Sequence, residues 1–142
     1  MAQTAKRRRR LRGSALVEGL LAICVFSTGI LATLILLAAA LVEAGNARLR
    51  SEASFLTASV LADMWTGERS LESLQTRYGS NQSDDFLAWQ EMVKARLPGV
   101  SSSAKSPQIT ISDKREVTVT LHWQAPGDGV ARQLVTVALI TD

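Results

Sequence analysis

Residues that could cross-link this chain are scarce, because its 142 residues include one cysteine and one histidine. Cys24 has no second cysteine with which to form an intramolecular disulfide, so a folded domain must be held together by packing alone. His122 has no cysteine, second histidine or cluster of acids in register with it, so the sequence predicts an exposed surface histidine. These scarcities exclude a disulfide-stapled scaffold and provide no group of metal ligands. We also find no nucleophile and base that would indicate catalysis.

The chain has no basic surplus beyond its first twelve residues. Its formal charge is +3 and its pI is about 9.5, but six of its sixteen basic residues lie together near the start: Lys6, Arg7, Arg8, Arg9, Arg10 and Arg12. The remainder holds ten basic residues against thirteen acids, a net charge near −3. The composition therefore argues against a nucleic-acid-binding protein.

The basic cluster directly precedes an uninterrupted apolar segment, residues 19–42. A helix of that length spans roughly 36 Å, enough to cross a hydrocarbon core of about 30 Å. The segment exceeds the roughly 7 to 15 apolar residues of a secretory signal. Cleavage at Ala38-Ala39-Ala40 by signal peptidase would leave a carboxylate at the start of the segment unexplained. Because only Arg48 and Arg50 follow soon after the segment, the charge asymmetry predicts a cytoplasmic N-terminus and an external C-terminal part.

That carboxylate is Glu18, the only ionisable group between Ser14 and Val42 apart from the thiol of Cys24. A carboxylate costs about 2.5 to 3.5 kcal/mol at the centre of a membrane helix and less near its end. Cleavage between Gly13 and Ser14 would create an amine that can compensate Glu18 of a neighbouring helix. The pattern therefore indicates an assembly signal.

The basic leader, Gly13, Glu18 as the fifth residue after it, and the apolar segment together resemble the class III signal of type IV pilins and pseudopilins. In that family a membrane peptidase cuts after the glycine and methylates the new terminus. The resemblance implies cleavage between Gly13 and Ser14, N-methylation of Ser14 and an assembly role for Glu18. This chain departs from the family pattern in having serine, where phenylalanine is usual, at the first mature position. It also has no helix-breaking proline in the apolar segment.

Shorter matches throughout the chain are similar to the PilV-type minor pilins. They are residues 27–31, 50–53, 61–65, Trp89, 97–99 and 117–123. The resemblance implies an α+β, type IV pilin-like fold, in which a small antiparallel β-sheet head packs on a long N-terminal helix. We expect a leader at 1–13, a transmembrane helix at 14–42, its amphipathic continuation at 43–66 and a periplasmic α+β head at 67–142.

The residues themselves predict how the head packs on the helix. Apolar residues recur at spacings of three and four and define one helix face: Leu49, Ala53, Leu56, Val60 and Met64. The helix is predicted to end at Thr66-Gly67, with the glycine in the left-handed cap conformation. A loop with one short helical turn is expected over residues 70–83.

A second helix is predicted over residues 84–97, opened by Asp84 and Asp85. Adjacent aspartates at a helix start favour the N-terminus by capping and by the helix dipole, and this explains the pair better than a metal site does. A serine-rich connector over 100–108 precedes three alternating strands, at 109–112, 117–123 and 134–141. A turn at 126–129 joins the last two, so we expect a three-stranded antiparallel sheet laid over the helix face.

The resulting expectation is a minor pilin that initiates or caps a type IV pilus and uses no cofactor, metal or catalytic residue. Its expected partners are other minor pilins and the major pilin, the prepilin peptidase, the inner-membrane assembly platform and membrane lipid. The protein is expected first in the bacterial inner membrane and then in the pilus.

Three alternatives remain open at this point. A type II secretion minor pseudopilin shares the signal and the helix, and a membrane-anchored periplasmic enzyme would keep its anchor uncleaved. A DNA-uptake receptor would use scattered basic residues, for which solvated surface charge is the expected explanation: Lys94, Arg96, Lys105, Lys114 and Arg115.

Overall fold

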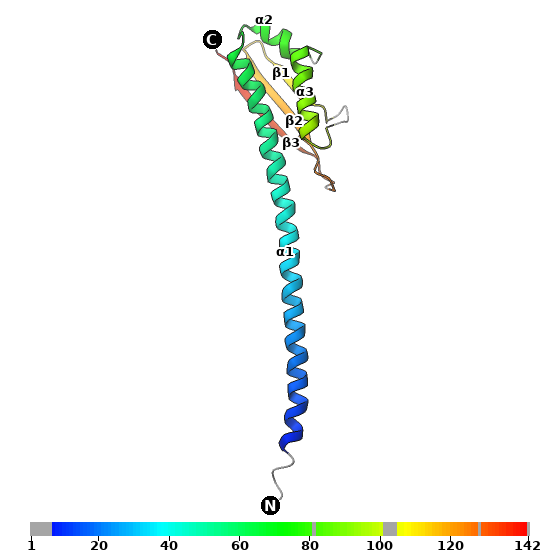
Figure 1. Ribbon diagram of the computed structural model, residues 1–142. Coiled ribbons are helices and arrows are strands. Elements are labelled where there is room, and N and C mark those ends of the chain that lie inside the picture. The colour runs from blue at the N-terminus through cyan, green and yellow to red at the C-terminus, as the bar shows by residue number, and fades with distance from the viewer. Residues whose placement is uncertain (1–6, 81, 101–104, 128, 142) are drawn as a thin grey trace, which may run out of the picture. The chain divides into compact units, whose positions relative to one another are not determined.

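The computed structural model describes residues 7–80, 82–100, 105–127 and 129–141, with side chains from residue 15 onward. Residues 1–6 of the predicted leader lie outside the described residues. The chain divides into two compact units, Met1–Glu43 and Ala44–Asp142. Helix α1 (Arg7–Thr66) contributes residues to both units, so each unit is described by itself (Figure 1).

The first unit consists of the apolar part of α1. The most apolar stretch of this helix has a mean hydropathy of 2.6, and none of it is buried within the protein. Leu20, Ile23 and Leu34 are 67%, 68% and 55% exposed. By length and composition the helix could cross a membrane, where lipid or other apolar helices would cover these side chains.

The second unit is a small α+β domain built around the C-terminal part of α1. After α1 come two short helical turns, α2 (Leu71–Leu74) and the π-helix η1 (Gln75–Gly79), and then α3 (Asp84–Arg96). Three strands follow: β1 (Gln108–Ile111), β2 (Glu116–Trp123) and β3 (Arg132–Leu139). In Figure 1 the two longer strands run lengthwise beside the upper part of α1, with α3 alongside.

The strands form one antiparallel sheet in the order β1-β2-β3. Val119 of β2 lies opposite Ile109 of β1 and Thr136 of β3, which fixes the register of all three strands. Residues of β2 alternate strictly between buried and partly buried or exposed positions. One face of the sheet therefore meets the helices, and the other faces outward.

A single apolar core joins that inner face to the helices. Its helical members are Ala53, Leu56, Val60 and Met64 of α1, Phe86, Trp89 and Val93 of α3, and Leu74 and Tyr78 of the short turns. Its sheet members include Ile109, Val117, Val119, Leu121 and Trp123. The predicted helix face is thus confirmed, and Leu49 packs at its margin.

Helix α3 is fixed against α1 by polar contacts as well as by packing. The indole Nε1 of Trp89 donates a hydrogen bond of 3.0 Å to the carbonyl oxygen of Leu56. At the C-terminal end of α3, Arg96 forms an ion pair of 2.9 Å with Glu52. Helix α3 ends at Arg96, one residue before the predicted end, because Leu97 before Pro98 has an extended backbone. Gly99 has φ +77° in the turn that follows.

Three details of the sequence-based expectation were wrong. The segment 70–83 contains α2 and η1 in place of a loop with one turn, because Leu74 and Tyr78 both enter the core and hold nine consecutive residues in helical turns. The third strand begins and ends two residues earlier than predicted, at Arg132 and Leu139. Helix α1 ends at Thr66 as expected, but Gly67 lacks the left-handed conformation, and its N–H donates a helical hydrogen bond of 3.0 Å to Asp63.

Candidate functional site

The residues of the predicted processing and assembly signal lie on one helix. Gly13 and Ser14 fall within the helical backbone of α1, and their side-chain environments lie outside the described residues. Glu18 follows one turn later and is exposed. Among the side chains that the structure describes, no hydrogen bond or ion pair joins Glu18 to another group.

Two threonine hydroxyls of the apolar segment are satisfied within the helix itself. The hydroxyls of Thr28 and Thr33 donate hydrogen bonds of 2.8 and 2.7 Å to the carbonyl oxygens of Cys24 and Ile30. A hydroxyl can do this because it carries its own proton, whereas an ionised carboxylate only accepts hydrogen bonds. An ionised Glu18 therefore cannot bond to a backbone carbonyl of the preceding turn in this way and requires a hydrogen-bond donor.

The helix face on which Glu18 lies carries both small and bulky apolar residues. At 3.6 residues per turn, the residues nearest the direction of Glu18 are Val25, Gly29 and Leu36, and Ala22, Ala32 and Ala40 flank them. A Cβ added at Gly29 would meet no atom within 4 Å. This face is apolar and uncovered within the described residues.

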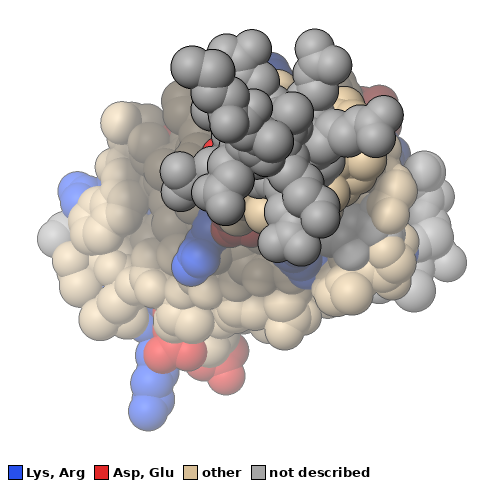
Figure 2. Space-filling model, turned by 90° about the horizontal axis from the view of Figure 1, so that it is seen from below, with Lys and Arg blue, Asp and Glu red and all other residues tan. Residues whose placement is uncertain are grey.

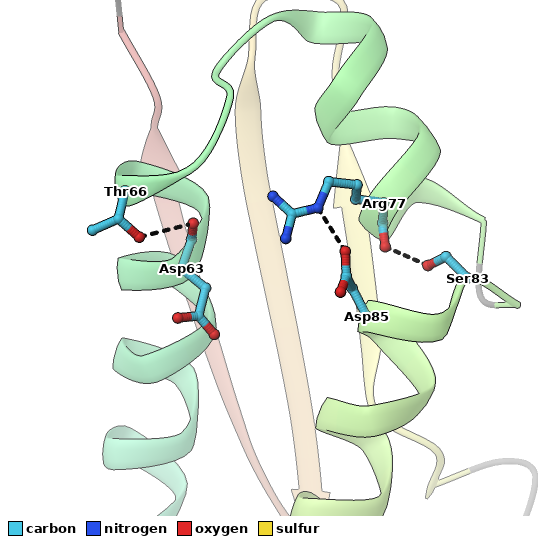
Figure 3. A network of polar contacts seen from close by, with 5 residues as sticks. All are labelled: Asp63, Thr66, Arg77, Ser83 and Asp85. Atoms are coloured by element: carbon cyan, nitrogen blue, oxygen red, sulfur yellow. Dashed lines mark hydrogen bonds and ion pairs between the residues drawn. The ribbon is translucent and has the colours of Figure 1, made fainter.

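The second unit carries a separate feature, a groove between α1 and α3. Its volume is about 300 Å³, and its walls include Val60, Asp63, Trp89 and Met92. Arg77 of η1 lies at one end of this groove, and Figure 3 shows its side chain between the two helices. The Nε atom of Arg77 lies 2.6 Å from a carboxylate oxygen of Asp85, the second residue of α3.

Arg77 connects the short helical turns with the helices through its side chain and its backbone carbonyl. Its bond to Asp85 raises the pKa of the guanidinium, and the Asp63 carboxylate adds to the same effect. The hydroxyl of Ser83 donates a hydrogen bond to the carbonyl oxygen of Arg77, also drawn in Figure 3. Because the side chains of Arg77 and Asp85 are 36% and 45% exposed, solvent screens the pair, which orients the segment more than it stabilises it.

Gly67, the residue after α1, lies close to Arg77. A Cβ at Gly67 would lie 2.7 Å from Nη1 of Arg77 and 3.2 Å from the carbonyl oxygen of Asp63, so the flexible end of Arg77 would have to shift. The sequence predicts a left-handed backbone conformation at Gly67, which the structure does not have. Nothing local in the sequence links Gly67 to Arg77, ten residues later.

The groove offers no catalytic arrangement. Asp85 is engaged by Arg77, and the groove residues include no serine, cysteine or histidine. In the described ranges, no three His, Cys, Asp or Glu residues gather as a possible metal site. These contacts indicate a structural role for the groove residues, in which Arg77 connects η1 with helix α3.

His122 corrects one prediction made from the sequence. It lies on the outward side of β2, as the alternation requires, but it is half-buried, and its Nδ1 atom is buried without a hydrogen-bond partner. Trp123 Nε1 on the inner side is likewise buried and unpartnered. The alternation in β2 therefore gives the side on which His122 lies but not its degree of burial.

Three of the five basic residues considered for DNA contact have polar partners in the second unit. Lys94 pairs with Glu91 at 2.8 Å, Arg96 pairs with Glu52, and Lys105 donates a hydrogen bond of 2.6 Å to Gln124. On the face shown in Figure 2, Lys and Arg side chains lie singly or beside acidic ones. These contacts favour the explanation by ordinary surface charge.

No family model matches the chain, and no curated protein or solved structure matches it significantly. The candidate site is therefore argued from its residues alone: a carboxylate that has no partner among the described side chains, on an exposed apolar helix, close to a glycine that follows a basic run.

Proposed function

We propose that the chain is a type IV pilin-like protein, most like the PilV-type minor pilins, that helps to initiate or cap a type IV pilus. The observation that carries the proposal is Glu18, a lone carboxylate on an apolar, uncovered helix. In this account the precursor crosses the inner membrane once, with its N-terminus in the cytoplasm and its head in the periplasm. The processed subunit then enters the pilus.

Processing converts the start of the chain into a partner for that carboxylate. Hydrolysis of the Gly13–Ser14 amide places a carboxylate on the released leader and a protonated amine on Ser14. Cleavage removes Lys6 and five arginines with the leader, so the new ammonium becomes the terminal cation of the subunit. N-methylation of Ser14 would keep that charge, because a secondary amine is also protonated near neutral pH.

Pairing between the ammonium of one subunit and Glu18 of its neighbour would set the register of the two helices. At about 4 Å and an effective dielectric near 20, such a pair is worth on the order of 4 kcal/mol before desolvation costs. Desolvation offsets much of this gain, so the pair contributes specificity more than stability.

The rest of the chain supports the same proposal. A small antiparallel sheet packs on the amphipathic part of α1. This arrangement is compatible with a subunit whose head is attached to the assembly through its helix. A type II secretion minor pseudopilin would share every one of these features. Copurification with pilus proteins or with secretion proteins distinguishes the two.

Processing is the direct test of the proposal. Peptide mapping of the protein from its native membrane should give Ser14 as the first residue, and Gly13→Arg should block the cut. Gly19→Ala is the matched control, because that glycine has open space around it and lies beyond the cleavage site. An intact Met1, or a first residue near Leu41, would contradict the proposal.

A further inference from the structure

The groove between α1 and α3 carries a charge that its own residues leave unbalanced. The charged side chains in its walls are Asp63, Arg77 and Asp85, two carboxylates against one guanidinium, so its formal charge is −1. Arg77 is bonded to Asp85, and in Figure 3 the Asp63 carboxylate lies on the opposite, α1 side. Among the described side chains, no hydrogen bond or ion pair joins that carboxylate to another group. The groove therefore has one negative charge without a partner.

A buried phenol lines the same groove. Tyr78 is 3% exposed, and in the described part of the chain its hydroxyl has no hydrogen-bond partner. Burial raises the pKa of this phenol, and the charges of Arg77, Asp85 and Asp63 act on the same pKa. The hydroxyl therefore lies within electrostatic range of every charged group of the groove. Because buried tyrosine hydroxyls usually have a hydrogen-bond partner, an occupant with a donor group is expected here.

The remaining walls of the groove are largely apolar, and one of them is aromatic. The indole Nε1 of Trp89 is bonded to the carbonyl oxygen of Leu56, so only the ring of Trp89 is available to an occupant. The ring face of tryptophan attracts cations. Val60 and Met92 add aliphatic surface, and Met92 is 45% exposed, so the groove opens onto the surface of the second unit. These walls suit an aliphatic chain that ends in a positive charge.

From the charge, the phenol and the apolar walls, we propose that the groove binds the side chain of a lysine from another protein chain. The ammonium pairs with Asp63 and donates a hydrogen bond to the hydroxyl of Tyr78, while the methylene groups pack along Trp89. A compact ammonium has three donors that reach acceptors on different elements, whereas the planar guanidinium of arginine suits a single bidentate carboxylate. The proposal does not depend on cleavage after Gly13 or on a role in a pilus.

Two other occupants fit the groove less well. A divalent metal ion needs several oxygen ligands, but Asp85 is engaged by Arg77, and no three His, Cys, Asp or Glu residues gather in the described ranges. A free amine would gain only the contacts of one short stem in a volume of about 300 Å³, whereas a lysine of a partner is supported by the contacts around it. Charge complementarity therefore favours a basic side chain that is presented by a protein.

The chemistry of the occupant is tested by adding N-acetyl-lysine methylamide to the full chain in detergent. We expect the indole N–H resonance of Trp89 to shift saturably and that of Trp65, which lies outside the groove, to stay unchanged. The uncharged analogue N-acetyl-norleucine methylamide should bind about fivefold more weakly, the upper range for an ion pair near a protein surface. Asp63→Asn should weaken the lysine analogue by about the same factor. Asp84→Asn is the matched control, because Asp84 is exposed and lies outside the groove.

Two observations separate binding from folding. The backbone carbonyl of Asp63 accepts the hydrogen bond that ends α1, and Asp63→Asn keeps that group, so thermal unfolding should match the parent. Tyr78→Phe keeps the ring and removes only the hydroxyl, and it should weaken the lysine analogue by about threefold.

The source of the lysine is tested in the native membrane with a water-soluble carbodiimide, which joins a carboxylate to an amine in contact with it. We expect mass spectrometry to find Asp63 joined to a lysine of another chain, with no such product in Asp63→Asn and none at Asp84. Equal binding of the norleucine analogue, or binding of the lysine analogue that Asp63→Asn leaves unchanged, would overturn the proposal. Binding of the lysine analogue without the cross-linked product would identify a free amine in place of a protein lysine and would also overturn it.

Discussion

Tyr78 couples its ionisation to the folding of the second unit. Burial raises the pKa of its phenol above the ordinary value of 10.0, and the nearby positive charge of Arg77 lowers it by a smaller amount. The guanidinium carbon lies 5.2 Å from the ring centroid. The neutral phenol is therefore the form that the folded head accommodates.

This predicts an alkaline loss of stability that depends on one residue. Because the folded pKa is raised, the contribution of Tyr78 is fully present below pH 10.0 and is lost as the pH rises through the folded value. Thermal unfolding of the full chain in detergent, followed by tryptophan fluorescence between about pH 8 and 11, should show a steeper decline than in Tyr78→Phe. Identical slopes would contradict the assignment. Because Tyr78 is the only tyrosine, its ultraviolet titration can be followed directly.

Residues differ in how far their surroundings can be predicted from the sequence. Glu18 can be identified from the sequence around it, because the basic run, the glycine and the apolar segment all lie within a few residues of it or begin there. The bond between Arg77 and Asp85 was not identified, since it depends on how η1 meets α3 in space. For His122 the strand alternation gave the correct side, but burial by neighbouring residues could not be inferred from that pattern.

Among the elements, α1 and β2 each contribute four residues to the core of the head. Trp123 is 3% exposed and lies in the same apolar cluster as Leu56 and Val60. Trp65, near the end of α1, is 42% exposed and stands outside that cluster. The two indoles provide a matched pair for testing the packing of β2 on α1.

Trp123→Ala should destabilise the second unit by about 3 to 5 kcal/mol, the usual cost of deleting a buried aromatic side chain. Trp65→Ala should change the stability by less than about 1 kcal/mol, as most surface substitutions do. Thermal unfolding of both variants measures the difference. Equal effects would show that β2 does not face the helix as described. Because the head has no disulfide to stabilise it, a loss of several kcal/mol would unfold it.

Long, regular patterns predicted the elements well, and short ones did not. The five-residue stripe of α1 and the alternation in β2 each repeat a period several times. In α2 and η1 only Leu74 and Tyr78 enter the core, so one interval of four residues was the whole signal. The start of β3 at Arg132 is set by pairing with Trp123 across the hairpin, a contact that its own composition does not encode.

For the molecule as a whole, the central claim is that one carboxylate directs a membrane-inserted chain into a filament. Glu18→Ala removes the only carboxylate of the apolar segment, so membrane insertion should be unchanged or improved. If Glu18 pairs with the new amine of a neighbour, the variant should still be cut after Gly13 but should not assemble. Insertion and assembly are thus separable in one variant.

The most direct measurement is quantitative mass spectrometry of filaments sheared from cells, with the membrane fraction measured in parallel. The account predicts that the parent chain is present in filaments with Ser14 as its first residue. It also predicts that Glu18→Ala is processed and retained in membranes but is absent from filaments or fails to support their initiation. Normal filament number with normal incorporation of Glu18→Ala would contradict the account.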